Sequence, residues 1–178
     1  PANQLGNDAA MINGARGGTI DIVSSGASNY NGIVTNTAAM ELPFVFRSAP
    51  HAYAVLDGPV GSGVLGELAP HGLKGLAYWE NGWRAFTNNK RPVKTPDDLK
   101  IQAFKLLGMN PSPMAIAELY TALEVGTFDA QEHPINVTWS AKFYEVQKHL
   151  TISNHVYSPL ILAMNKAKFD SLPANYQQ

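Results

Sequence analysis

Asn81-Gly82-Trp83-Arg84, read together with Asp129-Ala130-Gln131-Glu132-His133-Pro134, carries more information than any other part of this sequence. The first stretch places an arginine beside Trp83 and close to Trp79. Arginine is always charged at neutral pH, and its planar fork matches a carboxylate. An arginine among indoles near a strand end therefore predicts a contact with a small organic anion. The alternative is a surface arginine that pairs with a nearby carboxylate such as Glu80.

The composition excludes several classes of function. The chain has 178 residues, enough for one large domain or two small lobes, and a net charge of -1. That charge gives no electrostatic footprint for nucleic acid or an anionic membrane. The apolar run 160–164 is far shorter than the ~20 residues of a membrane span. Without cysteine there are no disulfides or thiolate metal sites, and the histidines lack metal-ligand spacing, so we expect no metal and no cofactor.

Helix and strand signals alternate along the chain, which predicts an α/β architecture. Pro and Gly positions, cap residues and apolar spacing give the expected elements. In the first half they are a strand at 19–23 that opens into a loop at 24–26, a helix capped by Ser48 that runs to Leu56, a strand at 73–79 and a solvated turn at 88–91. In the second half a helix starts at Ser112-Pro113 and ends at Gly126, with Ile116, Leu119, Tyr120 and Leu123 on one face. A second helix with core positions Trp139, Phe143, Val146 and Leu150 follows, and then a strand at 155–164 that is interrupted at Pro159.

The order of short motifs along the chain resembles one family. The motifs are Gln4-Leu5-Gly6-Asn7-Asp8, Leu42-Pro43-Phe44, Asn81-Gly82-Trp83-Arg84, Thr87-Asn88-Asn89-Lys90, the stretch 95–100, the stretch 110–114, the stretch 118–123, the stretch 142–148 and Ser171-Leu172-Pro173. Together they resemble the extracytoplasmic solute-binding proteins of tripartite ATP-independent periplasmic (TRAP) transporters. The resemblance covers almost the whole chain, and the order and spacing of the motifs make it specific.

The resemblance implies a bilobed α/β fold of the periplasmic-binding-protein type with a hinge, incomplete at both ends. The expected first lobe is 1–83, the second lobe 84–155 with a gap near Lys100/Ile101, and 156–178 returns to the first lobe. The family implies capture of a small organic acid in the periplasm and its delivery to TRAP membrane permease subunits. It implies no enzymatic activity, no membrane insertion and no nucleic-acid partner.

The resemblance also implies a set of ligand contacts. Arg84 occupies the place of a carboxylate-binding arginine, and bidentate charge-assisted bonds would give it orientation and strength. His133 stands where the family has asparagine, and it can donate a hydrogen bond and titrate. A second, more characteristic arginine strand is expected after Lys100 but is absent from the sequence. The remaining predicted contacts are Asp8, Ser25, Gly26, Asn29, Trp79, Asn81, Trp83, Glu132 and Tyr157, with one of the two indoles lining the site.

Two other functions compete with solute delivery. An enzyme that acts on an organic acid could use Glu132 and His133 as an acid–base pair, although the sequence has no nucleophile elbow and no phosphate loop. A sensing module of the same fold would use the same ligand pocket to report to a signalling partner. The aromatic surroundings of Arg84 favour a monocarboxylate with an apolar part.

Overall fold

The computed structural model describes residues 4–90, 92, 114 and 116–177. The chain divides into two compact units: unit 1 is Pro1–Asn81 with Val156–Gln178, and unit 2 is Gly82–His155. The predicted cap Ser112-Pro113, Arg91, the motif at 95–100, most of the motif at 110–114 and the Lys100/Ile101 junction lie outside the described residues.

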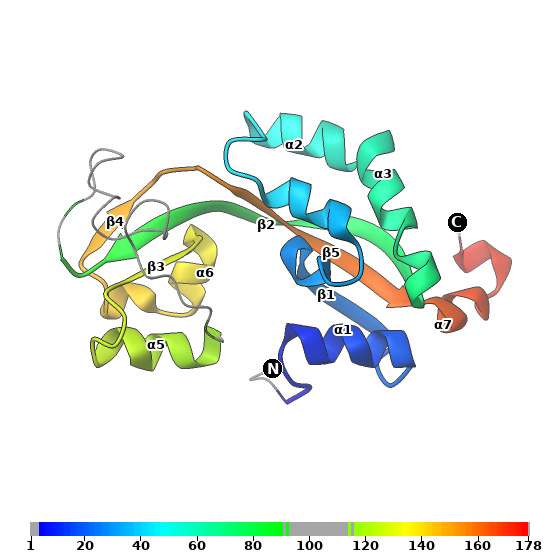
Figure 1. Ribbon diagram of the computed structural model, residues 1–178, viewed down its shortest axis with the longest axis horizontal. Coiled ribbons are helices and arrows are strands. Elements are labelled where there is room, and N and C mark those ends of the chain that lie inside the picture. The colour runs from blue at the N-terminus through cyan, green and yellow to red at the C-terminus, as the bar shows by residue number, and fades with distance from the viewer. Residues whose placement is uncertain (1–3, 91, 93–113, 115, 178) are drawn as a thin grey trace. The chain divides into compact units, whose positions relative to one another are not determined.

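Unit 1 combines helices with an antiparallel strand pair (Figure 1). Its strand β1 pairs with β5 from Ile22↔Met164 to Gly26↔Leu160, and helix α1 packs along both strands. The elements of unit 1 are α1 Asp8–Gly17, β1 Ile22–Gly26, η1 Ala27–Tyr30, η2 Thr35–Glu41, α2 Ala49–Leu56, α3 Pro59–Gly66, η3 Ala69–His71, the first part of β2 Leu73–Asn88, β5 Tyr157–Asn165, α7 Lys166–Asp170 and η6 Ala174–Tyr176.

Local signals explain how α2 begins. Ser48 Oγ accepts a hydrogen bond from the backbone N–H of His51, and Pro50 lies in the first turn. A serine cap satisfies one of the first N–H groups of a helix, and proline has no N–H to lose there. The predicted helix from Ser48 to Leu56 is therefore confirmed.

Strand β2 is longer than the sequence suggested. It runs from Leu73 to Asn88, whereas 73–79 was expected, because Gly82 does not end it. Gly82 has φ +116, a conformation that side chains disfavour, so glycine lets the strand continue through a local distortion. This residue is also the first of unit 2. The continuation corrects the predicted solvated turn at its first residue only, because Asn88 lies in the strand and is 2% exposed, whereas Asn89 and Lys90 follow the strand in a bend and Lys90 is exposed.

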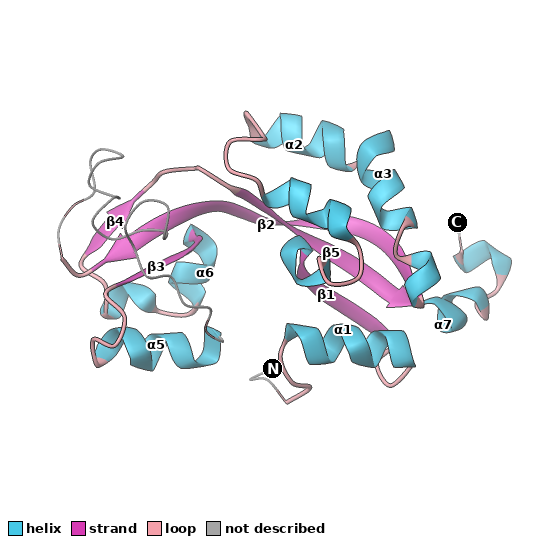
Figure 2. Ribbon diagram, viewed as in Figure 1, coloured by secondary structure: helices cyan, strands magenta, loops and turns pink. Residues whose placement is uncertain are grey.

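Unit 2 pairs the second part of β2 with two short strands, and helices accompany them (Figure 2). Both pairs are antiparallel, with Phe86 opposite Glu132 in β3 and opposite Thr151 in β4. Its core joins Leu119 and Leu123 to Phe143. The elements of unit 2 are the end of β2, α5 Ile116–Glu124, β3 Ala130–Pro134, α6 Ile135–Ser140, η5 Phe143–Glu145 and β4 His149–Thr151.

The predicted second helix of this half is wrong. Helix α6 ends at Ser140, and Lys142 adopts φ +58, which a regular right-handed helix does not allow. The chain then forms η5 and β4, so the apolar spacing from Trp139 to Leu150 does not lie on one face. Trp139 is 69% exposed and Leu150 51% exposed, while Phe143 is fully buried.

The first apolar stripe is confirmed in part. Leu119 and Leu123 lie in the core, whereas Ile116 is 44% exposed. The helix ends before Gly126, whose φ of +76 favours glycine, as expected. Strand β1 also differs, because Ser24, Ser25 and Gly26 belong to it and are not in a loop.

Phe143 should contribute far more to stability than Trp139. We expect Phe143→Ala to lower the free energy of unfolding by ~3–5 kcal/mol, because it removes a fully buried ring and leaves a cavity. Trp139→Ala removes a larger but exposed side chain that stacks on Tyr144, so a loss below ~1.5 kcal/mol is expected. Denaturant unfolding of the intact protein measures both changes. Equal losses in the two variants would contradict this assignment of the core.

Candidate functional site

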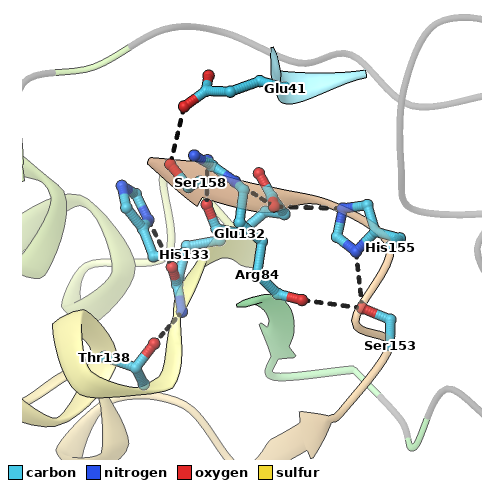
Figure 3. Close-up of polar contacts among 9 residues, drawn as sticks. Glu41, Arg84, Glu132, His133, Thr138, Ser153, His155 and Ser158 are labelled. Carbon is cyan, nitrogen blue, oxygen red and sulfur yellow. Dashed lines mark hydrogen bonds and ion pairs between the residues drawn. The ribbon is translucent and has the colours of Figure 1, made fainter. Parts of the chain in front are cut away.

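Arg84 is held along one edge by a single residue of the neighbouring strand. Its Nε lies 2.5 Å from Glu132 Oε1, and its Nη2 donates to the backbone oxygen of Glu132 at 2.8 Å (Figure 3). Phe86, two residues after Arg84 in β2, stands opposite Glu132 in the antiparallel pair. The Arg84 side chain keeps 23% of its surface exposed. The expected alternative partner Glu80 instead accepts a hydrogen bond from the hydroxyl of Tyr53.

His155 contacts the same carboxylate of Glu132 as Arg84 does. Its Nε2 lies 3.2 Å from Glu132 Oε1, its Nδ1 lies 2.8 Å from Ser153 Oγ, and its ring stacks on Phe86 with centroids 4.6 Å apart. Burial alone would raise the pKa of Glu132, but the hydrogen bonds from His155 and Arg84 and the charge of Arg84 outweigh it and lower that pKa. Glu132 is therefore ionised at neutral pH and balances the charge of Arg84.

His133 belongs to a different, neutral group on the same strand. Its Nδ1 lies 2.7 Å from Gln131 Oε1. Burial, together with the nearby charge of Arg84, lowers the pKa of His133 to about 4 against the opposing effect of Glu132. His133 is therefore neutral at pH 7, and the expected titration lies well below neutral pH.

Glu132 and His133 do not form an acid–base pair with each other. They are neighbours in β3, so their side chains point to opposite faces of the strand. Glu132 contacts Arg84 and His155, whereas His133 contacts Gln131. The arrangement on which an enzyme with this pair would depend is not found in the structure.

Unit 1 contains a second polar group among the predicted residues. Ser25 Oγ donates to Asp8 Oδ1 at 2.5 Å, and Asn29 Nδ2 donates to Ser25 Oγ at 2.9 Å. Ser25 is 2% exposed, whereas Asp8 and Asn29 are exposed. Gly26 has φ -54, a conformation open to any residue, so its backbone does not require glycine. The structure thus brings Asp8, Ser25 and Asn29 together.

The remaining predicted residues lie along β2 and β5. Trp79 is 53% exposed, and Asn81 and Trp83 are half-buried. Tyr157 is nearly fully buried and packs edge-on against Phe46 with ring centroids 5.6 Å apart. Nearby in unit 1, Ser158 Oγ donates to Glu41 at 2.8 Å (Figure 3). A ligand role for each of these predicted residues stays a prediction.

Sequence reasoning missed His155 and Gln131. His155 follows β4 by a short connection and could be found only through its contact with Glu132. Gln131 carried a usable signal, because it lies two residues before His133 and strand period places both on one face. Within the described residues, no three His, Cys, Asp or Glu side chains gather as a candidate metal site. The described helices include none with the length and hydropathy needed to span a membrane.

The family model for bacterial extracellular solute-binding protein, family 7, matches residues 1–178. The chain is 53% identical over 190 residues to the 2,3-diketo-L-gulonate-binding periplasmic protein YiaO of Escherichia coli (strain K12). That alignment covers 100% of this chain and 58% of the relative, so the chain spans less than two thirds of the relative's length.

Solved structures give the same result for the fold. A TRAP periplasmic solute-binding protein from Polaromonas sp. JS666, bound to D-erythronate, matches with a TM-score of 0.92 and 38% identity over 99% of this chain and 62% of its own. The sugar acid binding protein DctPAm from Advenella mimigardefordensis strain DPN7T, in complex with galactonate, matches with a TM-score of 0.90 and 38% identity over 98% and 60%. The predicted α/β fold of the periplasmic-binding-protein type is confirmed by this likeness.

The low pKa of His133 predicts how stability depends on pH. The ordinary pKa of histidine is 6.5, and in the folded protein that of His133 is about 4. Between these values the unfolded chain binds more protons, so this residue makes the free energy of unfolding rise with pH. We expect the free energy of unfolding of His133→Asn and His133→Gln to rise less steeply with pH between pH 4 and 6.5. Each variant lacks the histidine that takes up to one proton when the chain unfolds in this range. Denaturant unfolding across that range measures it, and an unchanged slope in both variants would contradict the assignment.

Proposed function

The chain belongs to family 7 of the bacterial extracellular solute-binding proteins, and from this premise we propose that the protein binds a small organic acid in the periplasm. It then delivers the acid to TRAP-type membrane permease subunits without transforming it. We further propose that the two units correspond to the two lobes of the family's fold.

The geometry of Arg84 is the single observation that supports acid binding best. The Arg84 side chain is partly exposed, and its guanidinium is held at two donor atoms by Glu132. An arginine already fixed in orientation loses less conformational freedom when a ligand carboxylate arrives, and this lowers the cost of binding. We propose that the ligand carboxylate contacts this guanidinium.

The ligands of similar proteins support the same class of compound. The name of the Escherichia coli relative specifies 2,3-diketo-L-gulonate, and the two structural neighbours hold D-erythronate and galactonate. These compounds differ in length and oxidation state but share a carboxylate. We therefore propose a sugar acid or a related hydroxy or keto acid as the ligand.

A second polar contact is proposed in unit 1. Asp8, Ser25 and Asn29 offer a carboxylate, a hydroxyl and an amide held together by hydrogen bonds. Such a group suits hydroxyl groups, because it contains both donors and acceptors. We propose that this group of unit 1 binds hydroxyl groups of a ligand.

A ligand screen tests the proposed function directly. Thermal unfolding of the intact protein is recorded with keto, hydroxy, dicarboxylic and sugar acids. An acid at 100 times its dissociation constant should add ~2.7 kcal/mol of stability and raise the melting temperature by several degrees. Recovery of the acid chemically unchanged after long incubation separates binding from catalysis. A cooperative transition that no acid shifts would contradict the proposal.

Replacement of Arg84 tests its role. We expect Arg84→Lys and Arg84→Ala to weaken acid binding tenfold or more, which is ~1.4 kcal/mol or more, because lysine keeps the charge but not the planar fork. Isothermal titration measures the dissociation constants, and circular dichroism checks the fold. Arg47→Lys, at an exposed arginine of unit 1, is the matched control and should bind like the wild type. Unchanged affinity in folded Arg84 variants would leave Arg84 as a structural partner of Glu132.

A further inference from the structure

Glu41 is a carboxylate of unit 1 to which the proposed function gives no role. It is the last residue of η2 and is half-buried, and its Oε1 accepts a hydrogen bond from Ser158 Oγ at 2.8 Å (Figure 3). Ser158 is the second residue of β5 and is 1% exposed. Across the part of the chain that the structure describes, no lysine, arginine or histidine forms an ion pair with Glu41. Its negative charge is therefore not balanced by a contact within those residues.

The space beside Gly26 brings Glu41 into the neighbourhood of Asn29. A Cβ atom at Gly26 would lie 3.5 Å from Asn29 Nδ2 and 3.9 Å from Glu41 Oε1. A third polar atom, Ser28 Oγ, would lie 3.8 Å away. These are ordinary van der Waals distances, and the φ of -54 does not require glycine. Glycine instead leaves a partly exposed space, edged by polar atoms, in which a ligand can approach the backbone closely.

The two buried serines of this region direct their hydrogens to carboxylates. Ser25 Oγ donates to Asp8 Oδ1 at 2.5 Å, and Ser158 Oγ donates to Glu41 Oε1. A hydroxyl has one hydrogen, so neither serine keeps one for a ligand. An ionised carboxylate only accepts, and two oxygens give it room for more than one hydrogen bond. The region is therefore rich in acceptors and suits ligand groups that donate.

We propose that Glu41 determines specificity in unit 1, because it accepts a hydrogen bond from a ligand hydroxyl beside Gly26 and repels a second carboxylate there. This inference rests on the proposed binding of ligand hydroxyls by unit 1. A hydroxyl can donate to the carboxylate of Glu41, whereas a ligand carboxylate would bring only acceptor oxygens and a like charge. Like charges that face each other at a binding site lower the affinity. Hydroxylated acids therefore bind in preference to dicarboxylates.

The preference is measured by isothermal titration of the intact protein with two four-carbon probes. D-erythronate carries hydroxyl groups and one carboxylate, and succinate carries two carboxylates. We expect the wild type to bind D-erythronate at least tenfold more tightly. Glu41→Gln keeps an oxygen that can accept from Ser158, but it removes the charge and adds an N–H₂ donor. We expect this variant to reduce the ratio of the two affinities tenfold or more, mainly through tighter binding of succinate.

Glu67→Gln is the matched control for charge. Glu67 is an exposed carboxylate of unit 1 that accepts hydrogen bonds from Asn36, so the variant removes the same charge at another place in the unit. We expect it to keep the wild-type ratio. An equal change in the two variants would overturn the inference, because net charge and not the position of Glu41 would then set the preference.

Gly26→Ala tests the position of the ligand without changing a charge. The added methyl group would fill the space beside Glu41 at ordinary contact distances, so we expect the fold to be kept and D-erythronate to bind at least tenfold more weakly. Gly63→Ala is the control, because a Cβ at this glycine of α3 would meet no atom within 4 Å, and it should bind like the wild type. Circular dichroism checks the fold. This pair keeps the inference testable if Glu41→Gln does not fold.

The outcomes separate this inference from the proposed function. An unchanged ratio in folded Glu41→Gln, or unchanged binding of D-erythronate by folded Gly26→Ala, would overturn the inference alone. Tighter binding of succinate than of D-erythronate by the wild type would do so as well, while acid binding stands. If no acid in the ligand screen binds, the proposed function fails and takes this inference with it.

Discussion

The contact of Arg84 with Glu132 is the interaction on which the polar arrangement of unit 2 depends. It joins β2 to β3 through the carboxylate and the backbone oxygen of Glu132. The contact therefore neutralises the charge of Arg84 and stabilises the register of the two strands. Each partner is about four-fifths buried, and neither charge would be tolerated there alone. His155 contacts the same carboxylate oxygen at 3.2 Å, and its ring covers Phe86. The guanidinium is consequently fixed in direction before any ligand arrives.

The sequence predicted those parts of the fold that local chemistry determines. Helix α2 has its serine cap and its proline within one turn, so its start could be predicted. The segment from Trp139 to Leu150 could not be predicted. Its apolar residues have helical spacing, but that spacing does not reveal that the helix is broken at Lys142. Strand β2 was underestimated because glycine normally interrupts a strand, whereas Gly82 lets this one continue.

The candidate site was predicted as a set of residues, whose ligand roles stay predictions, but its contacts could not be predicted. Residue type and motif order selected Arg84, Glu132 and His133. The partner of Arg84 lies 48 positions away, and no local rule selects Glu132 over Glu80 at that separation. Strand period, however, would have been enough to place Glu132 and His133 on opposite faces once 130–134 was assigned to a strand. That single assignment excludes Glu132 and His133 as an acid–base pair. It also places the ion pair of Arg84 and Glu132 on one face of β3 and the neutral group of Gln131 and His133 on the other.

This separation gives the two faces of β3 different electrostatic properties. On one face of β3, Glu132 balances the charge of Arg84, so the pair presents a directed donor with little net charge. On the other face, Gln131 and His133 belong to a neutral network in which every assigned donor meets an acceptor. In unit 2 a buried threonine and two glutamines set the positions of these neutral donors and acceptors.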